Sequence, residues 1–480
     1  MSRFLASALV VGLWCLGTES GFGQETPAEV VQEIIVPAVS ASEYYAPSAM
    51  PDRIVMSLIG DPRSSRGINW RTSTAVTIAY AELAEAQAGP LFVSQAKRLT
   101  ATTELLQVDA VAAHFHHATL GDLKPNTMYV YRVGDGTNWS EWFQFRTTPS
   151  ENAPFSFIYF GDAQNQIRSM WSRVIREAYR DAPQAAFILH AGDLINKADS
   201  DSEWAEWFAA CAWLNAMTPT VAVPGNHEYA KNDNDTRRLS HLWRPSFHQP
   251  TNGPPGLEET CFTFVYQNMR FIAMNSNTQL SEQAVWLDNV LSANQAPWVV
   301  CSFHHPVYST GKSRDNAELR TKWKPIFDKY KVDLVLTGHD HTYGRTGFEV
   351  PSVLTVEVGG QDVVVGDKPE INLPTGVQAV DAAGTVYVVS VSGPKMYDHS
   401  RVEFMQRIAE DTQLYQVISI DGDCLRFEAK TAIGELYDAF ELHKSAAGQK
   451  NRLIEVSPIV PQNLRPVPPV VDAVEPEGKN

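Results

Sequence analysis

The chain has 480 residues, of which 44% are hydrophobic and 20% charged, and it contains 5 cysteines. This length suits two or three domains with real cores, and the composition excludes a wholly disordered chain and a small disulfide-stapled protein. The net charge of −16 excludes a general nucleic-acid binder, because such binding needs basic side chains that neutralise phosphates. Residues 150–445 carry −12 of this charge.

The first residues have the pattern of a secretory signal. Arg3 precedes an apolar run over residues 4–17, and the small residues Gly21 and Gly23 suit a signal peptidase. The run is shorter than the ~20 residues that a membrane-spanning helix needs. We therefore expect residues 1–23 to be removed, leaving a secreted, periplasmic or extracellular protein without a stable membrane span.

Four cysteines remain after such cleavage, namely Cys211, Cys261, Cys301 and Cys424. An even number in an oxidising compartment permits disulfides, with three alternative pairings, and buried free thiols are the other interpretation. For Cys301, which lies within a hydrophobic run, we expect a free thiol.

The region before residue 150 has two parts. Residues 24–48 contain three prolines and mixed polar and apolar residues, so they indicate a linker or an arm. Residues 49–149 consist of short alternating stretches broken by Gly and Pro, which is typical of an all-β sandwich. In residues 120–133, a turn through Pro125 and Asn126 leads into a predicted strand. This stretch resembles a fibronectin type III domain. The histidines at positions 114, 116 and 117 lie in the same region, and we expect them to be surface residues of a strand and not a metal cluster.

From residue 150 to residue 445 the pattern changes to an α/β one. Short apolar runs at residues 155–160, 186–190, 220–223, 271–274, 298–303 and 332–336 predict buried strands. Several of these runs are separated by helix-like segments, and three later strands complete a sheet. The proline-rich residues 446–480 lack periodicity, and we expect an extended or disordered tail.

Residues that can bind metals follow five of these strands. Glycine often lies beside them and lets the backbone turn tightly. In open α/β sheets the carboxyl ends of the strands are where sites assemble, so we expect these side chains to meet at one edge. They are Asp162, Asp193, Asn226, His304, His339 and His341.

Carboxylate, amide and imidazole ligands suit zinc, manganese and iron, and a structural thiolate zinc site is disfavoured because no cysteine accompanies them. Two aspartates and three histidines are more than one metal ion needs. A shared carboxylate would hold two ions ~3.5 to 4 Å apart, which is the spacing used to clamp a phosphoryl group.

The ordered series of Asp162, Gly192-Asp193, Gly225-Asn226-His227-Glu228, His304 and Gly338-His339-Asp340-His341 resembles the motifs of the calcineurin-like metallophosphoesterases. The preceding sandwich and the His304-x-Pro306-x-Tyr308 run resemble the purple acid phosphatase branch. This resemblance implies a four-layer catalytic domain of two packed mixed sheets flanked by helices. It also implies that Asp162 and His341 bind one metal, that Asn226, His304 and His339 bind the other, and that Asp193 bridges them.

The sequence departs from the family pattern at two positions. Asn196 stands where purple acid phosphatases carry the tyrosine that ligates ferric iron, and Gln164 stands where the wider superfamily has a histidine. Either amide could be a weaker ligand, and we favour Gln164 because it follows Asp162 on the same loop. Without the phenolate, zinc, manganese or iron(II) become plausible, and we predict a colourless protein.

The resemblance implies a metal-dependent phosphoric ester hydrolase, acid phosphatase-like, that attacks phosphomonoesters with a metal-bound hydroxide. His227 is our first candidate for protonating the leaving group or stabilising charge, and His305 is either a second candidate or a residue that supports the loop. We expect small or exposed phosphoesters as substrates; the oligomeric state is left open. A phosphodiesterase on the same metal pair and a binding or adhesion module with a decayed metal site are the alternatives.

Overall fold

The computed structural model describes residues 39–108, 111–232, 234, 236–347, 354–358, 361–365, 384–402, 404–445, 451–456 and 460–466. The predicted signal peptide and most of the predicted arm lie outside these ranges. The chain divides into two compact units, residues 1–44 and residues 45–480. The described part of the first unit contains the short helix α1 (Ala41–Tyr44). Nowhere in the described ranges is there a helix long and apolar enough to cross a membrane.

The predicted all-β sandwich is present at the start of the second unit. The strands β1 (Asp52–Ser57), β2 (Arg66–Ser73), β5 (Thr102–Val108) and β6 (Val111–Leu120) lie in one sheet, and β3 (Tyr80–Glu85), β4 (Lys97–Thr100), β7 (Met128–Gly134) and β8 (Phe143–Arg146) form the other. A 3₁₀ helix, η1 (Pro90–Gln95), precedes β4. Apolar side chains such as Trp70 and Tyr131 fill the core between the two sheets.

The position of His116 differs from the prediction for this sandwich. The three histidines at positions 114, 116 and 117 are predicted to be surface residues of a strand, but the side chain of His116 is fully buried. Its Nε2 lies 2.7 Å from Thr72 Oγ1 and its Nδ1 lies 2.9 Å from Thr103 Oγ1. Hydroxyls on the two neighbouring strands therefore satisfy both ring nitrogens, which makes burial of the ring tolerable.

The sandwich sheet continues into the α/β region. β9 (Phe155–Phe160), β10 (Ile188–His190) and β11 (Thr220–Ala222) are parallel, and β1 pairs with β11 through Ser57 and Thr220. The strands β23 (Leu414–Asp421), β24 (Cys424–Thr431), β25 (Leu436–His443) and β26 (Arg452–Val456) extend the other side. The resulting eleven-stranded sheet has the order β26-β25-β24-β23-β9-β10-β11-β1-β2-β6-β5.

A second sheet of seven strands has the order β14-β15-β16-β17-β21-β18-β22. Its strands are β14 (Phe262–Tyr266), β15 (Met269–Ala273), β16 (Trp298–Ser302), β17 (Leu334–Thr337), β18 (Tyr343–Thr346), β21 (Val386–Val389) and β22 (Met405–Ala409). Parallel pairing joins β15, β16, β17 and β21, whereas β14, β18 and β22 pair antiparallel. The sheet is therefore mixed, as expected.

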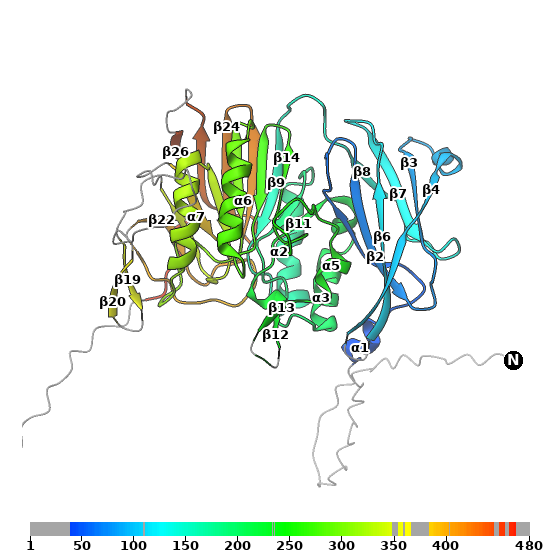
Figure 1. Cartoon of the computed structure of the whole chain (residues 1–480), viewed down its shortest axis with the longest axis horizontal. Coiled ribbons are helices and arrows are strands. Elements are labelled where there is room, and N and C mark those ends of the chain that lie inside the picture. Colours follow the sequence, from blue (N-terminus) through cyan, green and yellow to red (C-terminus); the bar gives the residue numbers. More distant parts are fainter. Residues whose placement is uncertain are drawn as a thin grey trace, which may run out of the picture. The chain divides into compact units, whose positions relative to one another are not determined.

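Helices cover the outer face of each sheet, so the domain has the predicted four layers. On β9, Phe157 and Tyr159 point to the core between the sheets, whereas Ile158 and Phe160 pack under helices α2 (Ser172–Asp181) and α3 (Asp201–Cys211). This alternation follows from the two-residue period of a strand. The second sheet carries α6 (Leu280–Ser292) and α7 (Ala317–Tyr330), which Figure 1 shows side by side.

Shorter elements complete the described structure. They are η2 (Ile167–Trp171, a π-helix), α4 (Leu214–Met217), η3 (Asn226–Glu228, a 3₁₀ helix), β12 (Tyr229–Lys231), β13 (Arg237–Leu239), α5 (Trp243–Ser246), β19 (Leu354–Val358) and β20 (Gln361–Val365). β12 pairs with β13, and β19 pairs with β20, as two-stranded sheets.

Two further expectations meet the structure here. The region beyond residue 446 was expected to be an extended or disordered tail, but Arg452–Val456 form the edge strand β26 beside β25. The apolar run of Leu453 and Ile454 is too short to show the alternating pattern that predicts a strand. The four cysteines outside the predicted signal are free thiols, and three of them, Cys301 included, are buried. The structure therefore favours the free-thiol interpretation over a disulfide.

Candidate metal centre

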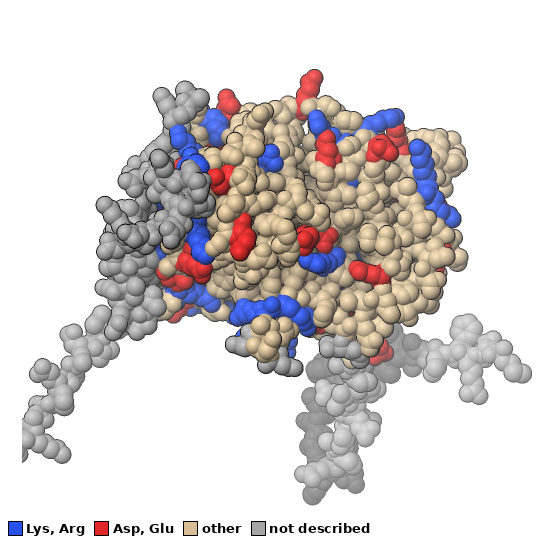
Figure 2. Space-filling model, in the orientation of Figure 1, with Lys and Arg blue, Asp and Glu red and all other residues tan. Residues whose placement is uncertain are grey.

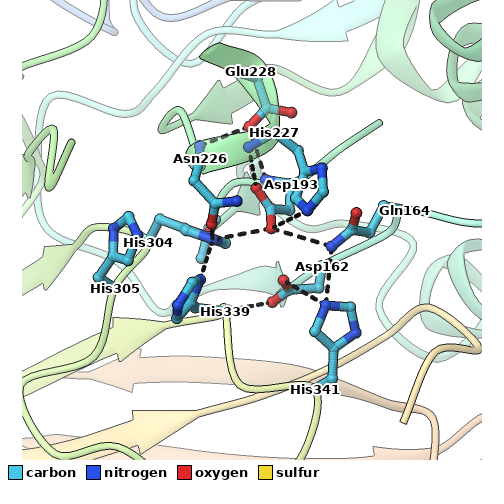
Figure 3. A network of polar contacts seen from close by, with 12 residues as sticks. Asp162, Gln164, Asp193, Asn226, His227, Glu228, His304, His305, His339 and His341 are labelled. Carbon is cyan, nitrogen blue, oxygen red and sulfur yellow. Dashed lines mark hydrogen bonds and ion pairs between the residues drawn. The ribbon is translucent and has the colours of Figure 1, made fainter. Parts of the chain in front are cut away.

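The predicted ligand residues follow the carboxyl ends of parallel strands from both sheets. Asp162, Asp193 and Asn226 come after β9, β10 and β11 of the first sheet. His304 and His339 come after β16 and β17 of the second sheet. Because the two sheets pack face to face, these ends meet at one edge of the domain. Figure 3 shows the side chains converging from the five loops.

The loops are tight, and two glycines explain how they approach so closely. A Cβ at Gly225 would lie 2.1 Å from Asp193 Oδ1, and a Cβ at Gly338 would lie 2.3 Å from Asp162 Oδ2. No larger residue fits at either position without moving a carboxylate. Asp162, Asp193, His339 and His341 themselves have positive φ angles, a conformation that costs free energy and that clusters at functional sites.

One group of ligand atoms surrounds the Asp162 carboxylate. A ligand atom each of Asp162, Asp193 and His341 lies within 4.8 Å of the others. The Gln164 amide is drawn into the same group, because its Nε2 lies 3.1 Å from Asp193 Oδ2 and 2.9 Å from His341 Nε2. His341 Nδ1 donates to the Lys395 carbonyl at 2.9 Å, which leaves the Nε2 lone pair facing the group.

A second group surrounds His304. Its Nε2 lies 3.1 Å from Asp193 Oδ2, 3.2 Å from Asn226 Oδ1 and 3.2 Å from His339 Nδ1. His304 Nδ1 donates to the Ala191 carbonyl at 2.8 Å, so the other nitrogen points into the site. Asp193 Oδ2 therefore contacts members of both groups, which is the position a bridging carboxylate would take.

Buried polar atoms without partners show that these residues fit metal ions. Asp162 Oδ1 and Gln164 Oε1 are buried and lack a hydrogen-bond partner. Exchanging the amide oxygen and nitrogen of Gln164 would aim Oε1 at the group around Asp162, as a ligand requires. A buried acceptor left unpaired is costly, and a cation would satisfy both atoms.

The charges in the site also indicate that these residues suit metal ions. Burial and the neighbouring Asp193 carboxylate raise the pKa of Asp162 well above its usual range. Burial lowers the pKa of His304, but the Asp193 carboxylate outweighs burial and raises that pKa to about 9. Two carboxylates buried this close need positive charge to stay ionised, and either protons or metal ions can supply it.

His227 lies at the rim of the site, with its side chain 27% exposed. Its Nδ1 donates to the Asn196 carbonyl at 2.6 Å, and its Nε2 lies 4.0 Å from Asp193 Oδ2. Its own backbone N–H donates to Asp193 Oδ1 at 2.9 Å. Asn196, the other candidate amide ligand, thus supports the site through its backbone carbonyl, whereas the Gln164 amide lies among the ligands.

His305, like His227, is partly buried, and its ring lies against His339, with centroids 4.3 Å apart. Its backbone N–H donates to Ser276 Oγ at 3.0 Å, and its Nδ1 lies 2.8 Å from the same hydroxyl oxygen. Burial and the charge of His304 lower the pKa of His305 to about 3. The ring therefore stays neutral, which suits hydrogen bonding better than proton transfer.

Glu228 is a functional residue that sequence reasoning left without a role. Its buried carboxylate accepts from the backbone N–H groups of Asp193 at 2.8 Å, Leu194 at 2.8 Å and Gly225 at 2.6 Å. It therefore ties the loop after β10 to the loop after β11. Its place two residues after Asn226 in the Gly-Asn-His-Glu motif was the available signal.

The loop after β21 was also missed. The Gly393 N–H donates to the Asp162 carbonyl at 2.7 Å, and Lys395 provides the carbonyl that orients His341. Tyr397 packs on the His341 ring, with centroids 4.7 Å apart. The available signal in the sequence was the segment from Ser390 to Gly393, which contains serine and glycine and directly follows an apolar strand, as the ligand loops do.

A cavity of about 640 Å³ opens beside Asn226 and His227. Three cations line it, namely Lys197, Lys231 and Arg237. Figure 2 shows Lys and Arg side chains gathered over the β12–β13 hairpin that carries two of them. In a domain whose net charge is strongly negative, this concentrates positive potential at the mouth of the site.

The comparisons with known proteins agree with this geometry. The family described as calcineurin-like phosphoesterase matches residues 155–343, and the family described as purple acid phosphatase, N-terminal domain, matches residues 51–147. Residues 155–343 therefore form a calcineurin-like phosphoesterase domain, and residues 51–147 form a purple acid phosphatase N-terminal domain. These matches support a metal-dependent phosphoester hydrolase, as the sequence resemblance implied.

The relatives of this metallophosphoesterase span plants, bacteria and animals. A probable purple acid phosphatase 20 of Arabidopsis thaliana is 27% identical over 62% of this chain and 69% of its own length. An uncharacterized protein of Mycobacterium tuberculosis is 30% identical over 48% of this chain and 50% of its own length. Acid phosphatase type 7 of Danio rerio is 27% identical over 55% and 64%. The matches thus span between half and about two thirds of these relatives.

Solved structures confirm the fold. The purple acid phosphatase PPD1 from yellow lupin seeds has a TM-score of 0.66 at 16% identity, covering 83% of this chain and 75% of its own. PhoD has a TM-score of 0.57 at 15% identity, covering 90% and 95%. Both support a β-sandwich followed by a four-layer phosphoesterase domain.

Proposed function

We propose that this metallophosphoesterase hydrolyses phosphomonoesters outside the cytoplasm, at a site for two metal ions of the zinc, manganese or iron class. The observation that carries the proposal is the position of Asp193 Oδ2, 3.1 Å from both His304 Nε2 and Gln164 Nε2. One carboxylate oxygen lies between two groups of ligand atoms, which suits a bridged pair of ions.

The ligands divide as the resemblance implied. Asp162 and His341, with Gln164 as a weak additional ligand, would hold one ion, and Asn226, His304 and His339 would hold the other. Asp193 would belong to both. When bound, such a pair lowers the pKa of water and neutralises charge on the phosphoryl oxygens. The seven side chains and the unpartnered Asp162 Oδ1 argue against the alternative of a decayed site.

His227 is the proposed proton donor to the leaving group. Because its Nδ1–H is held by the Asn196 carbonyl, Nε2 is the nitrogen that faces the cavity. A proton on Nε2 can pass to the departing alkoxide, which is otherwise a poor leaving group. His305, neutral and anchored on Ser276, would instead donate a hydrogen bond.

The lining of the cavity favours monoesters over diesters. A phosphomonoester carries nearly two negative charges at neutral pH, whereas a diester carries one. A monoester is therefore attracted more strongly than a diester by the positive side chains of Lys197, Lys231 and Arg237. The expected signal peptide supports export.

A phosphoester panel with parallel metal quantification tests the proposal. The purified chain, reconstituted separately with zinc, manganese and iron, should turn over p-nitrophenyl phosphate with a kcat/KM at least about tenfold above that for bis(p-nitrophenyl) phosphate. A preference for the diester would replace the monoesterase proposal with a phosphodiesterase. Absence of turnover in all three reconstituted forms would overturn both.

A further inference from the structure

A thiol, an imidazole and a carboxylate converge on the outer face of the first sheet, far along the chain from the phosphoesterase ligands. Cys424 begins β24 and pairs directly with His443 at the end of β25. Glu441 lies two residues before His443, so the pleat of β25 puts both on one face. Partly exposed side chains on this face alternate with buried ones over residues 424–428 of β24 and residues 440–443 of β25, which places the cluster at the surface. The edge strand β26 pairs with β25 beside it (Figure 1).

The three side chains are close enough to share one cation. His443 Nε2 lies 3.9 Å from Cys424 Sγ and 2.9 Å from Glu441 Oε2, and the three ligand atoms all lie within 4.8 Å of one another. Tetrahedral zinc, with bonds of about 2.3 Å to sulfur and about 2.0 Å to nitrogen and oxygen, needs separations of about 3.5 Å for S···N and about 3.3 Å for N···O. Shifts of about 0.4 Å would meet both values.

The surroundings orient these ligands. Arg426 Nη1 donates to Glu441 Oε1 at 2.9 Å, which leaves Oε2 directed at His443. Outer partners of this kind fix the ligands of metal sites. Because Cys424 and His443 are partners in the strand ladder, their Cα atoms are also held in place.

The donor set selects the kind of ion. Thiolate and imidazole favour zinc and other thiophilic ions over magnesium and calcium, which prefer oxygen. Of the described cysteines, Cys424 is the one that is not buried. We propose that Cys424, Glu441 and His443 form a separate binding site for a zinc-class divalent cation, which would clamp β24 to β25 and leave a coordination position for water.

Cadmium is the probe, because a cadmium–thiolate bond absorbs in the ultraviolet and the phosphoesterase ligands are oxygen and nitrogen only. The full chain, with its phosphoesterase site loaded with zinc and kept reduced by a phosphine, is titrated with Cd²⁺. The band should saturate at one equivalent per chain, and excess Zn²⁺ should suppress it. Cys424→Ser should abolish the band while leaving turnover of p-nitrophenyl phosphate unchanged.

Substitutions of the other two ligands separate a site from a lone reactive thiol. His443→Gln and Glu441→Gln should each weaken Cd²⁺ binding by at least about tenfold. Glu428→Gln is the matched control, since Glu428 lies on the same face and also pairs with Arg426, yet is not a ligand; its affinity should match the wild type. No band, a band surviving in Cys424→Ser, a band resistant to Zn²⁺, or unchanged affinity in both ligand variants would overturn the proposal.

Discussion

His227 Nδ1 donates a 2.6 Å hydrogen bond to the carbonyl of Asn196, which orients the other ring nitrogen toward the cavity. Removal of the imidazole ring should therefore reduce the rate of hydrolysis most for substrates with poor leaving groups. For His227→Gln we expect kcat on an alkyl phosphate to fall by about 10²- to 10⁴-fold, with a much smaller loss on p-nitrophenyl phosphate. Steady-state kinetics on the two substrates measure the difference.

The exposed His241 provides the control for that variant. His241→Gln should leave both rates unchanged. Equal losses on the alkyl and aryl substrates in His227→Gln would assign His227 to phosphate binding instead of proton transfer.

Glu203 positions the segment on which His227 depends. Its Oε2 accepts from the backbone N–H of Asn196 at 2.6 Å and of Lys197 at 2.9 Å. Glu203→Ala should therefore misplace the Asn196 carbonyl and reproduce, more weakly, the leaving-group dependence of the His227 variant. We expect about a tenfold loss of kcat on the alkyl phosphate, with KM little changed.

Glu206, on the same helix α3, offers a matched comparison. Glu206→Ala should keep the wild-type ratio of alkyl to aryl rates. If Glu203→Ala also keeps that ratio, the positioning role is wrong, and recovery of the ratio in Glu203→Asp or Glu203→Gln would support it.

Acid should destabilise the sandwich through His116. Burial lowers the pKa of this ring to about 4, whereas an unfolded histidine has a pKa of about 6.5. The unfolded chain therefore binds a proton first as the pH falls, so the stabilisation is complete above pH 6.5 and is lost toward pH 4. Between pH 7 and pH 4.5 the His116 contribution should fall by about 2 to 3 kcal/mol.

Urea unfolding of the wild type and of His116→Gln at both pH values measures this contribution. The variant should lose less unfolding free energy on acidification than the wild type, while His241→Gln should behave like the wild type. Identical pH dependence in all three proteins would show that His116 protonation is not coupled to unfolding.

The purified protein should be colourless. The purple colour of the resembled family comes from a tyrosine bound to ferric iron, and Asn196 occupies that position here. Its contact with the site is the backbone carbonyl that accepts from His227. Visible absorption spectroscopy of the iron-loaded protein should show no strong charge-transfer band, and such a band would mean that another phenolate reaches the metals.

The sequence predicted the catalytic core well because the pattern there is strong. Buried strands such as β9 are continuous apolar runs, and the ligands follow them directly, so the edge at which Asp162 and Asp193 meet could be inferred. The predicted strand ends agree with the structure to within a few residues, because most of the runs are followed by a glycine or a polar residue.

Features that depend on distant neighbours could not be predicted. The buried state of His116 depends on Thr72 and Thr103 on adjacent strands. The apolar pattern of β26 is too short to predict a strand, and the strand is defined by its pairing with β25. Glu228 belongs to a recognised motif, but its role of joining two loops appears only when the backbone N–H groups it accepts from are in place.

The most direct test of the account is metal content measured together with turnover, in the wild type and in Asp193→Asn. The wild type should bind close to two metal ions per chain after reconstitution, and turnover of p-nitrophenyl phosphate should rise with loading and vanish on chelation. Asp193→Asn should lose turnover, because the carboxylate between the two ligand groups is gone. Fewer than one metal ion per reconstituted wild-type chain, or retained turnover in Asp193→Asn with bound metal, would contradict the bridged two-metal site.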